Sequence, residues 1–329
     1  MTSAGAAVEY HTKDFEWDEL REEVEKDPSL RYHLAPSSPP PGHHQDLLSS
    51  SPSRDCDAWR SFHRQHSTGR FFKERRYLLK EFPELAAHDG RPRKVLEVGC
   101  GNGSTALPIL RAGENILVYA CDCSSDALER AKEMIENAGD PSMKERFHPF
   151  LLDISVCGFA GELCCNSCRT SPITRSLECS SDVKDKFCEA NGSPSVDVQC
   201  CISGVDYVTL VFTLSAVPFQ KMPFLLSECI SILKPGGLLL FRDYGNGLQR
   251  LYDMTMLRFP PEQKVGFREY MRSDGTFSYF FSLDVVRNLF LDAGFLELEL
   301  EYCCIRSVNR LKGKDMHRVW AHGKFRKPV

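Results

Sequence analysis

The segment from residue 95 to residue 122 constrains the fold of this chain more than any other. A short apolar stretch at residues 95–98 is followed by glycines at positions 99, 101 and 103. A glycine loop between a strand and a helix lets a ligand approach the backbone, because no Cβ stands in the way. A second apolar stretch, residues 116–121, ends on Asp122, whose carboxylate can accept hydrogen bonds from both hydroxyls of a ribose. The segment therefore predicts an α/β fold that binds a nucleoside-type ligand at its strand ends.

The rest of the chain continues the alternation of strands and helices. Helices are expected at residues 104–111, 124–138, 222–233 and 283–293, and strands at residues 95–98, 116–121, 147–152, 205–212 and 238–242. This alternation predicts a doubly wound, mostly parallel sheet with helices on both faces. Residues 296–304 and 319–325 are two further strands, expected to form an antiparallel hairpin at one edge. The expected sheet has seven strands.

The first 56 residues differ in composition from the rest. Residues 14–26 have the apolar spacing of a short amphipathic helix among acidic side chains, and residues 36–54 are rich in Pro and Ser. We therefore expect residues 1–56 to form an acidic extension and a flexible linker. Residues 57–329 are expected to form one enlarged folded domain.

The expected location is the cytoplasm, with the nucleus as an alternative. No apolar run approaches the eighteen or so residues that span a bilayer, and the N-terminus lacks the pattern of a secretory signal, so no membrane partner is expected. The net charge of −4 gives no general attraction for nucleic acid. Bases concentrated at residues 306–327 nevertheless leave a nucleic-acid partner open.

A cysteine-rich insertion at about residues 157–201 separates the third and fourth expected strands. Cys165 and Cys168 have the spacing of a zinc knuckle, and Cys164, Cys200 and Cys201 could complete four ligands. One such pair without a matching second pair favours a surface insertion with incidental cysteines. No metal site is therefore expected.

Two classes of cofactor compete for the glycine loop. Dinucleotide-binding loops usually carry their third glycine at the position of Ser104 and bind a pyrophosphate at the helix N-terminus. Here Gly103 comes one residue early, and Glu97 precedes the loop. A third carboxylate, Asp153, ends the third strand, where it can reach an adenine amino group. The cationic, phosphate-free S-adenosyl-L-methionine fits this pattern better than a dinucleotide, which argues against a dehydrogenase.

Short motifs spread over residues 59–328 carry a resemblance to a known family. The most specific are Phe-Phe-Lys-Glu-Arg at 71–75, Glu-Val-Gly-Cys-Gly at 97–101, Leu-Ser-Ala-Val at 214–217, Phe-Arg-Asp-Tyr-Gly at 241–245 and Arg-Ser-Asp-Gly-Thr at 272–276. With these motifs the chain resembles the methyltransferase-like enzymes that make N3-methylcytidine in the anticodon loop of tRNA. The resemblance implies a Rossmann-like class I methyltransferase fold, S-adenosyl-L-methionine as cofactor, position 32 as the methylated cytosine, and the tRNA anticodon stem-loop as partner. Whether an accessory protein takes part stays open.

The same resemblance implies a set of cofactor-binding residues. They are Trp59, His63, Gly99, Gly101, Asp122, Asp153, Ile154 and Val211. His63 stands where relatives usually have Tyr, and an imidazole can still stack and donate a hydrogen bond. A second departure is the five-residue stretch 246–250, which separates two motifs that are adjacent in relatives.

Methylation of cytosine N3 needs positioning more than proton transfer, because the neutral base has an available lone pair. The product ring is cationic, so we expect the carboxylate of Asp243 near the base. Its alternative role is a structural acid paired with Arg242. Tyr244, with Phe71 and Phe72, is expected to stack on the splayed base. Arg75 is expected to hold backbone phosphates or the base.

Two other functions remain open from the sequence alone. One is a class I methyltransferase that acts on a small molecule or a protein, with the same cofactor site and a different rim. The other is a non-catalytic binding subunit that keeps the cofactor site for stability. Basic segments at residues 70–76 and 306–327 favour RNA over the first alternative.

Overall fold

The fold is taken from a computed structural model of the protein. It describes residues 14, 26, 28, 31–34, 52–66, 74–86, 90–159, 163, 204–245, 259–309 and 314–329. The motif phenylalanines Phe71 and Phe72, the stretch 246–250, most of the predicted helix at 14–26 and most of the cysteine-rich insertion lie outside the described residues.

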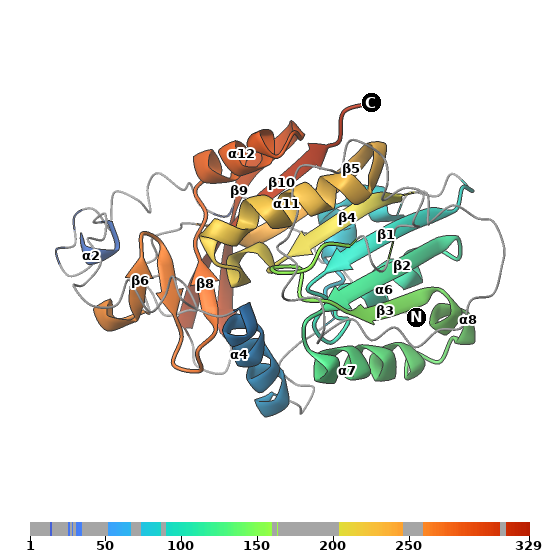
Figure 1. Ribbon diagram of the computed structural model, residues 1–329, viewed down its shortest axis with the longest axis horizontal. Helices are drawn as coiled ribbons and strands as arrows, with labels where there is room; N and C mark the ends of the chain where they lie inside the picture. Colours follow the sequence, from blue (N-terminus) through green and yellow to red (C-terminus); the bar gives the residue numbers. More distant parts are fainter. Residues whose placement is uncertain are drawn as a thin grey trace, which may run out of the picture.

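A seven-stranded sheet forms the centre of the molecule (Figure 1). Its spatial order is β3-β2-β1-β4-β5-β10-β9, and all neighbours are parallel except the two pairs made by β10. The strands are β1 (Arg93–Val98), β2 (Ile116–Asp122), β3 (Phe147–Leu151), β4 (Val205–Val211), β5 (Leu233–Tyr244), β9 (Leu296–Asn309) and β10 (Lys314–Arg326). The predicted mostly parallel seven-stranded sheet with an antiparallel edge hairpin is confirmed.

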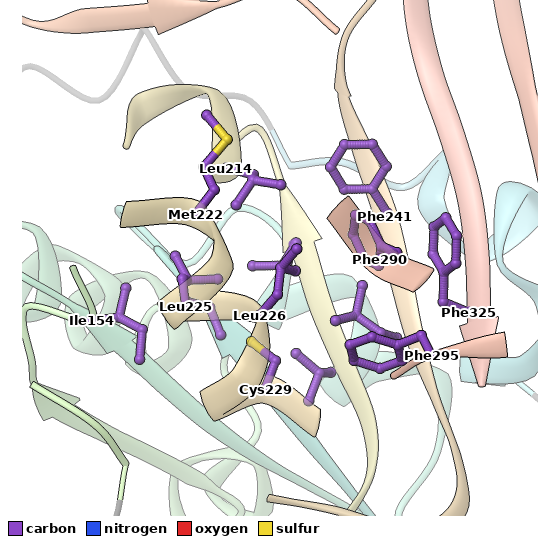
Figure 2. Packing of buried hydrophobic residues seen from close by; sticks show 14 of the residues in the cluster. Ile154, Leu214, Met222, Leu225, Leu226, Cys229, Phe241, Phe290, Phe295 and Phe325 are labelled. Carbon is purple, nitrogen blue, oxygen red and sulfur yellow. The ribbon is translucent and has the colours of Figure 1, made fainter. Parts of the chain in front are cut away.

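Helices cover both faces of this sheet, because its strands are apolar on both sides. The helices of the main domain are α4 (Pro52–Gln65), α5 (Leu78–Glu81), α6 (Ala106–Ala112), α7 (Ser125–Glu136), α8 (Pro141–Glu145), α11 (Met222–Ile232) and α12 (Leu283–Asp292). Neighbouring strand residues alternate between the two cores: Leu96 packs with α11 and α12, whereas Val95 packs with α5, α6 and α7. Leu226 and Cys229 of α11 lie against the strands in the first core (Figure 2).

A small three-stranded sheet stands beside the main one. It consists of β6 (Lys264–Gly266), β7 (Glu269–Met271) and β8 (Phe277–Tyr279). The short helix α2 (Arg31–Leu34) of the N-terminal extension packs on it: His33 Nδ1 lies 2.8 Å from the Tyr270 hydroxyl, and the Tyr32 hydroxyl donates to the Phe259 carbonyl at 2.7 Å. The sequence did not predict this sheet, whose strands are only three residues long.

Element boundaries differ from the prediction in three places. Helix α4 already begins at Pro52, inside the stretch expected to be linker and ahead of the expected domain start at residue 57. Strand β5 begins at Leu233, so the Lys-Pro-Gly-Gly segment ends helix α11 but belongs to the strand. Helix α6 begins at Ala106, because the glycine loop continues through Thr105.

The start of the cysteine-rich insertion is part of the fold. Phe159 and Leu163 are 1% and 4% exposed and belong to the core that contains α11. The backbone amide of Phe159 donates to the Glu228 carboxylate at 2.9 Å. The insertion expected from residue 157 therefore carries core side chains at least as far as Leu163.

Candidate functional site

A pocket opens where β1, β2 and β4 end. Strands β1 and β4 are neighbours although the chain leaves β1 toward β2, so the strand order reverses between them. Ligands of open α/β sheets bind at such a switch point, outside the carboxyl ends of the strands. Every residue expected to bind the cofactor lines this one pocket: Trp59, His63, Gly99, Gly101, Asp122, Asp153, Ile154 and Val211.

The glycine loop forms the floor of the pocket. Gly99 has a φ of +67°, and a Cβ at this position would lie 2.5 Å from Cγ2 of Thr213. The Thr213 hydroxyl donates to the Val98 carbonyl at 2.8 Å, which ties the end of β4 to the loop. Gly99 is therefore required both by its left-handed backbone and by the close approach of Thr213.

Asp122 joins the loop to the second strand. One carboxylate oxygen accepts from the amide of Gly101 at 2.9 Å and the other from the amide of Ser124 at 2.9 Å. A carboxylate has about four acceptor positions, so each oxygen retains one for a ligand hydroxyl. Asp122 can thus bind a ribose while it holds the loop in place.

Helix α4 closes the pocket from the N-terminal side. Trp59 Nε1 donates to the Ala216 carbonyl at 3.4 Å, and Arg60 Nε donates to the Cys123 carbonyl at 3.1 Å. The side chain of His63 is 5% exposed, and burial lowers its pKa against the opposing charge of Asp122. The His63 ring is therefore neutral at pH 7 and can face a cationic ligand.

The far side of the pocket suits an adenine ring. Ile154 and Val211, 7% and 3% exposed, offer apolar surface to its faces. Asp153 Oδ1 accepts from the Ser155 amide at 3.0 Å and from its hydroxyl at 2.7 Å. The carboxylate is thereby oriented in the pocket, where it can accept from an exocyclic amino group.

Two side chains at the glycine loop have a buried oxygen that accepts no hydrogen bond from the described residues. Asn102 lines the pocket, and its Oδ1 accepts no hydrogen bond from any of the residues that the structure describes. Glu97 lies just before the loop, is 1% exposed, and has an Oε2 that is likewise without a partner in the described part of the chain. Burial raises the pKa of Glu97 to about 8, although the charge of Arg75 opposes the rise.

Asp243, which the sequence analysis expected near the target base, is not among the residues that line this pocket. Its side chain is fully buried and is absent from the described pocket lining. One oxygen accepts from the Ser215 amide at 2.9 Å and the other from the Tyr244 amide at 2.8 Å. Burial raises the pKa of Asp243 to about 6, although these hydrogen bonds oppose the rise. Its carboxylate organises the backbone after β4 and β5.

Arg242, the alternative partner considered for Asp243, pairs with a different carboxylate. Arg242 is 1% exposed and pairs with Glu81, not with Asp243. Its guanidinium lies 4.3 Å from the ring centre of Trp320 and 4.8 Å from that of Tyr77. The same Glu81 accepts from Nδ1 of His322 at 2.8 Å, if that nitrogen carries the proton. This buried network joins β5, β10 and α5 behind the site.

Arg75 reaches the pocket, and Tyr244 stands behind its lining. The guanidinium of Arg75 donates to the Thr105 hydroxyl at 2.9 Å and lies 5.3 Å from the ring centre of Phe212. The Tyr244 ring is 5.1 Å from the Phe212 ring. Sequence reasoning missed Phe212, which lines the pocket at the end of β4. Only the backbone conformation, which has no signature in the sequence, directs this ring inward.

The basic segment at 306–327 does not become a free cationic strip over its described side chains. Lys324 pairs with Glu84 at 3.0 Å and with Glu299 at 3.1 Å. Lys327 donates to the carbonyls of Ser231 and Leu233. Two of the bases counted toward RNA binding therefore stabilise the fold.

This fold and this pocket define a class I methyltransferase that depends on S-adenosylmethionine. The family described as a methyltransferase domain matches residues 70–300. A crystal structure of an S-adenosylmethionine-dependent methyltransferase from Anabaena variabilis has the same fold, with a TM-score of 0.52, 15% identity and coverage of 83% of this chain and 94% of that one.

Curated relatives identify the family within this class of methyltransferases. The tRNA N(3)-cytidine methyltransferase METTL6 of Rattus norvegicus is 35% identical over 82% of this chain and 78% of its own. The tRNA N(3)-cytidine methyltransferase METTL2 of Danio rerio is 31% identical over 94% of this chain and 84% of its own. The chain belongs to the tRNA N(3)-cytidine methyltransferase family. None of its described helices is long and apolar enough to cross a membrane.

Proposed function

We propose that this protein transfers a methyl group from S-adenosyl-L-methionine to N3 of cytosine 32 in the anticodon loop of tRNA. One observation carries the proposal: the cofactor residues expected from the sequence line a single pocket, in a chain 35% identical to a tRNA N(3)-cytidine methyltransferase. A binding subunit retaining only a structural pocket has no need for this complete set of cofactor-binding residues.

The cofactor would lie along the strand ends. Asp122 binds the ribose hydroxyls, Asp153 the adenine amino group, and Ile154 and Val211 the faces of the adenine. The floor made by Gly99, Gly101 and Asn102 holds the methionine portion. Trp59 and His63 of α4 cover the ligand on the side of the pocket that this helix closes. S-adenosyl-L-methionine supplies a methyl group activated by the adjacent sulfonium.

The residues of this chain have mainly to position the base. The N3 lone pair forms the new N–C bond as the S–C bond breaks, and the electron pair of that bond stays on sulfur. The base gains one positive charge, and no proton moves. Since N3 lies on the Watson–Crick edge, the base must leave the stack and be held by aromatic faces. Arg75 lines this part of the site, Tyr244 stands behind it against Phe212, and Asp243 holds the neighbouring backbone.

The domain organisation, the partner and the location of the protein follow from the proposed methylation of tRNA. The catalytic unit comprises residues 57–329 together with the preceding turn of α4, and the extension 1–56 and the insertion after Leu163 are additions to it. The partner is the tRNA anticodon stem-loop. Buried thiols in the described ranges, among them Cys100, Cys121 and Cys229, support a reducing compartment, the cytoplasm or the nucleus.

A pair of transcripts tests the position of methylation. An unmodified tRNA with cytosine at position 32 should gain 3-methylcytidine, and the same tRNA with uridine at position 32 should gain none. Nucleoside digestion and mass spectrometry measure the product in both. Equal amounts of 3-methylcytidine from the two transcripts would place the target outside position 32.

A further inference from the structure

Phe212 has a backbone conformation that side chains other than glycine rarely adopt. Its φ is +57°, and within the described ranges only Arg268 shares this property among non-glycine residues. A bulky residue in this region is strained, at a cost of roughly 1–3 kcal/mol. Such strain persists only where the surroundings impose it, and it concentrates at functional sites.

The surroundings of Phe212 impose the conformation from both sides. The amide of Phe212 still donates to the Arg242 carbonyl at 2.8 Å, which continues the pairing of β4 with β5. The next residue, Thr213, is already seated on the glycine loop through its bond to the Val98 carbonyl. The chain must therefore turn within one residue, and this turn directs the Phe212 ring into the pocket.

Neighbouring side chains contact the Phe212 ring but leave part of it accessible from the pocket. It lines the pocket and is half-buried. The rings of Tyr244 and Trp320 lie 5.1 Å and 6.3 Å from it, centre to centre. Arg75, which is bonded to Thr105, fixes its position from a further side. An aromatic ring held in this way is preorganised to receive a planar ligand.

The target base becomes cationic during the reaction, and an aromatic ring in the pocket can interact with such a base. The cytosine becomes cationic during methyl transfer, and the carboxylate expected to balance that charge, Asp243, faces backbone amides instead. The face of an aromatic ring carries partial negative charge and attracts cations. We propose that Phe212 stacks on the target cytosine and stabilises its developing positive charge. The inference rests on the proposed function, since it needs a base that becomes cationic.

Three substitutions separate this role from simple packing. Phe212→Leu keeps an apolar side chain and removes the ring, so the single-turnover rate should fall about 10- to 100-fold, the range expected for one base–aromatic stack. Phe212→Tyr keeps the ring and should retain most of the rate. Phe212→Gly relieves the backbone strain, so it should lose the rate without a matching loss in melting temperature. Phe219→Leu, a half-buried aromatic outside the described pocket lining, is the matched control.

Two readouts do not depend on turnover. Calorimetry should show that Phe212→Leu still binds S-adenosyl-L-methionine, with a much smaller loss in affinity than in rate, although Phe212 lines the cofactor pocket. A tRNA with fluorescent pyrrolo-cytidine at position 32 should be quenched on binding to the parent and to Phe212→Tyr, but much less by Phe212→Leu. If Phe212→Leu quenches and reacts like the parent, or if Phe212→Tyr is as slow as Phe212→Leu, the inference is wrong. A parent that forms no 3-methylcytidine instead overturns the proposed function.

Discussion

At the scale of single residues, Gly99 is restricted both by its backbone conformation and by its neighbour Thr213. Alanine there would combine a left-handed backbone with a Cβ 2.5 Å from Thr213. We expect Gly99→Ala to lower the free energy of unfolding by about 2–5 kcal/mol. In Gly101→Ala the nearest atom to the Cβ is 3.7 Å away, so only the backbone strain of about 1–2 kcal/mol should appear.

A second substitution tests the cause of the Gly99 effect. Thr213→Ala removes both atoms nearest to the new Cβ, so part of the stability lost in Gly99→Ala should return in the double variant. Urea denaturation of the parent, both single variants and the double variant measures this coupling. Simple additivity of the two losses would show that Thr213 does not restrict position 99.

Glu97 predicts a dependence of stability on pH. Its pKa is raised from 4.5 to about 8 by burial, so unfolding releases a proton between these values. The contribution of Glu97 is therefore fully present below about pH 4.5 and is lost as pH rises toward 8, by up to about 1.4 kcal/mol per pH unit. Glu97→Gln cannot titrate, so its free energy of unfolding should fall less steeply between pH 5 and 8.

Denaturant titrations at several pH values measure that slope. The matched control is Glu129→Gln, because the Glu129 side chain is 66% exposed and its removal should leave the slope of the parent unchanged. Parallel curves for the parent and Glu97→Gln would mean that Glu97 is ionised in the folded protein.

At the scale of elements, helix α4 is the part of the site that the cofactor should order most. It contributes Trp59 and His63 to the pocket and is held by the Lys221–Asp55 pair at 3.0 Å and by the bond from Arg60. Ligand contacts with α4 stabilise its closed position by mass action, up to about 100-fold in opening equilibrium at 100 times the dissociation constant. Hydrogen exchange should slow in α4 on cofactor binding and remain unchanged in α12.

Two results of the hydrogen-exchange experiment would contradict the expected ordering of α4. Exchange in α4 could remain unchanged at a cofactor concentration where calorimetry shows the site to be full. This result would show that α4 does not contact the cofactor. Equal slowing in α4 and α12 would indicate a global gain in stability and not closure of the pocket.

The accuracy of the sequence prediction also differs by element. Strands β1, β2 and β4 were predictable because each is a short stretch rich in apolar residues, and a glycine borders both β1 and β4. Helix α4 was partly assigned to the linker, since Pro52 and Ser53 favour loops as readily as helix starts. The positions of Phe212 and Asp243 were not predictable: one depends on a strained backbone turn, and the other on amides brought together by β4 and β5. Only the folded chain defines these contacts.

At the scale of the whole molecule, the cysteine-rich insertion should be separable from the fold once its core residues are kept. Replacing residues 166–200 by a short Gly/Ser linker should leave melting and cofactor affinity nearly unchanged, because loop length affects closure entropy only weakly. Extending the deletion back to Gly158 removes Phe159 and Leu163, which are 1% and 4% exposed. That longer deletion should cost several kcal/mol, as large core truncations do, measured by the same melting curves. A short deletion that unfolds the chain would assign the insertion a structural role.

The activity proposed for this pocket is methylation of N3 of cytosine in tRNA. The most direct measurement incubates unmodified tRNA and S-adenosyl-L-methionine, isotopically labelled in its methyl group, with the parent and with Asp122→Ala. Nucleoside mass spectrometry then separates 3-methylcytidine from its isomers by retention time. We predict that the label appears in 3-methylcytidine with the parent and falls at least about tenfold with Asp122→Ala, which loses buried hydrogen bonds to ligand and loop. Label in another methylated nucleoside, or no label with a parent that binds the cofactor, would contradict the account.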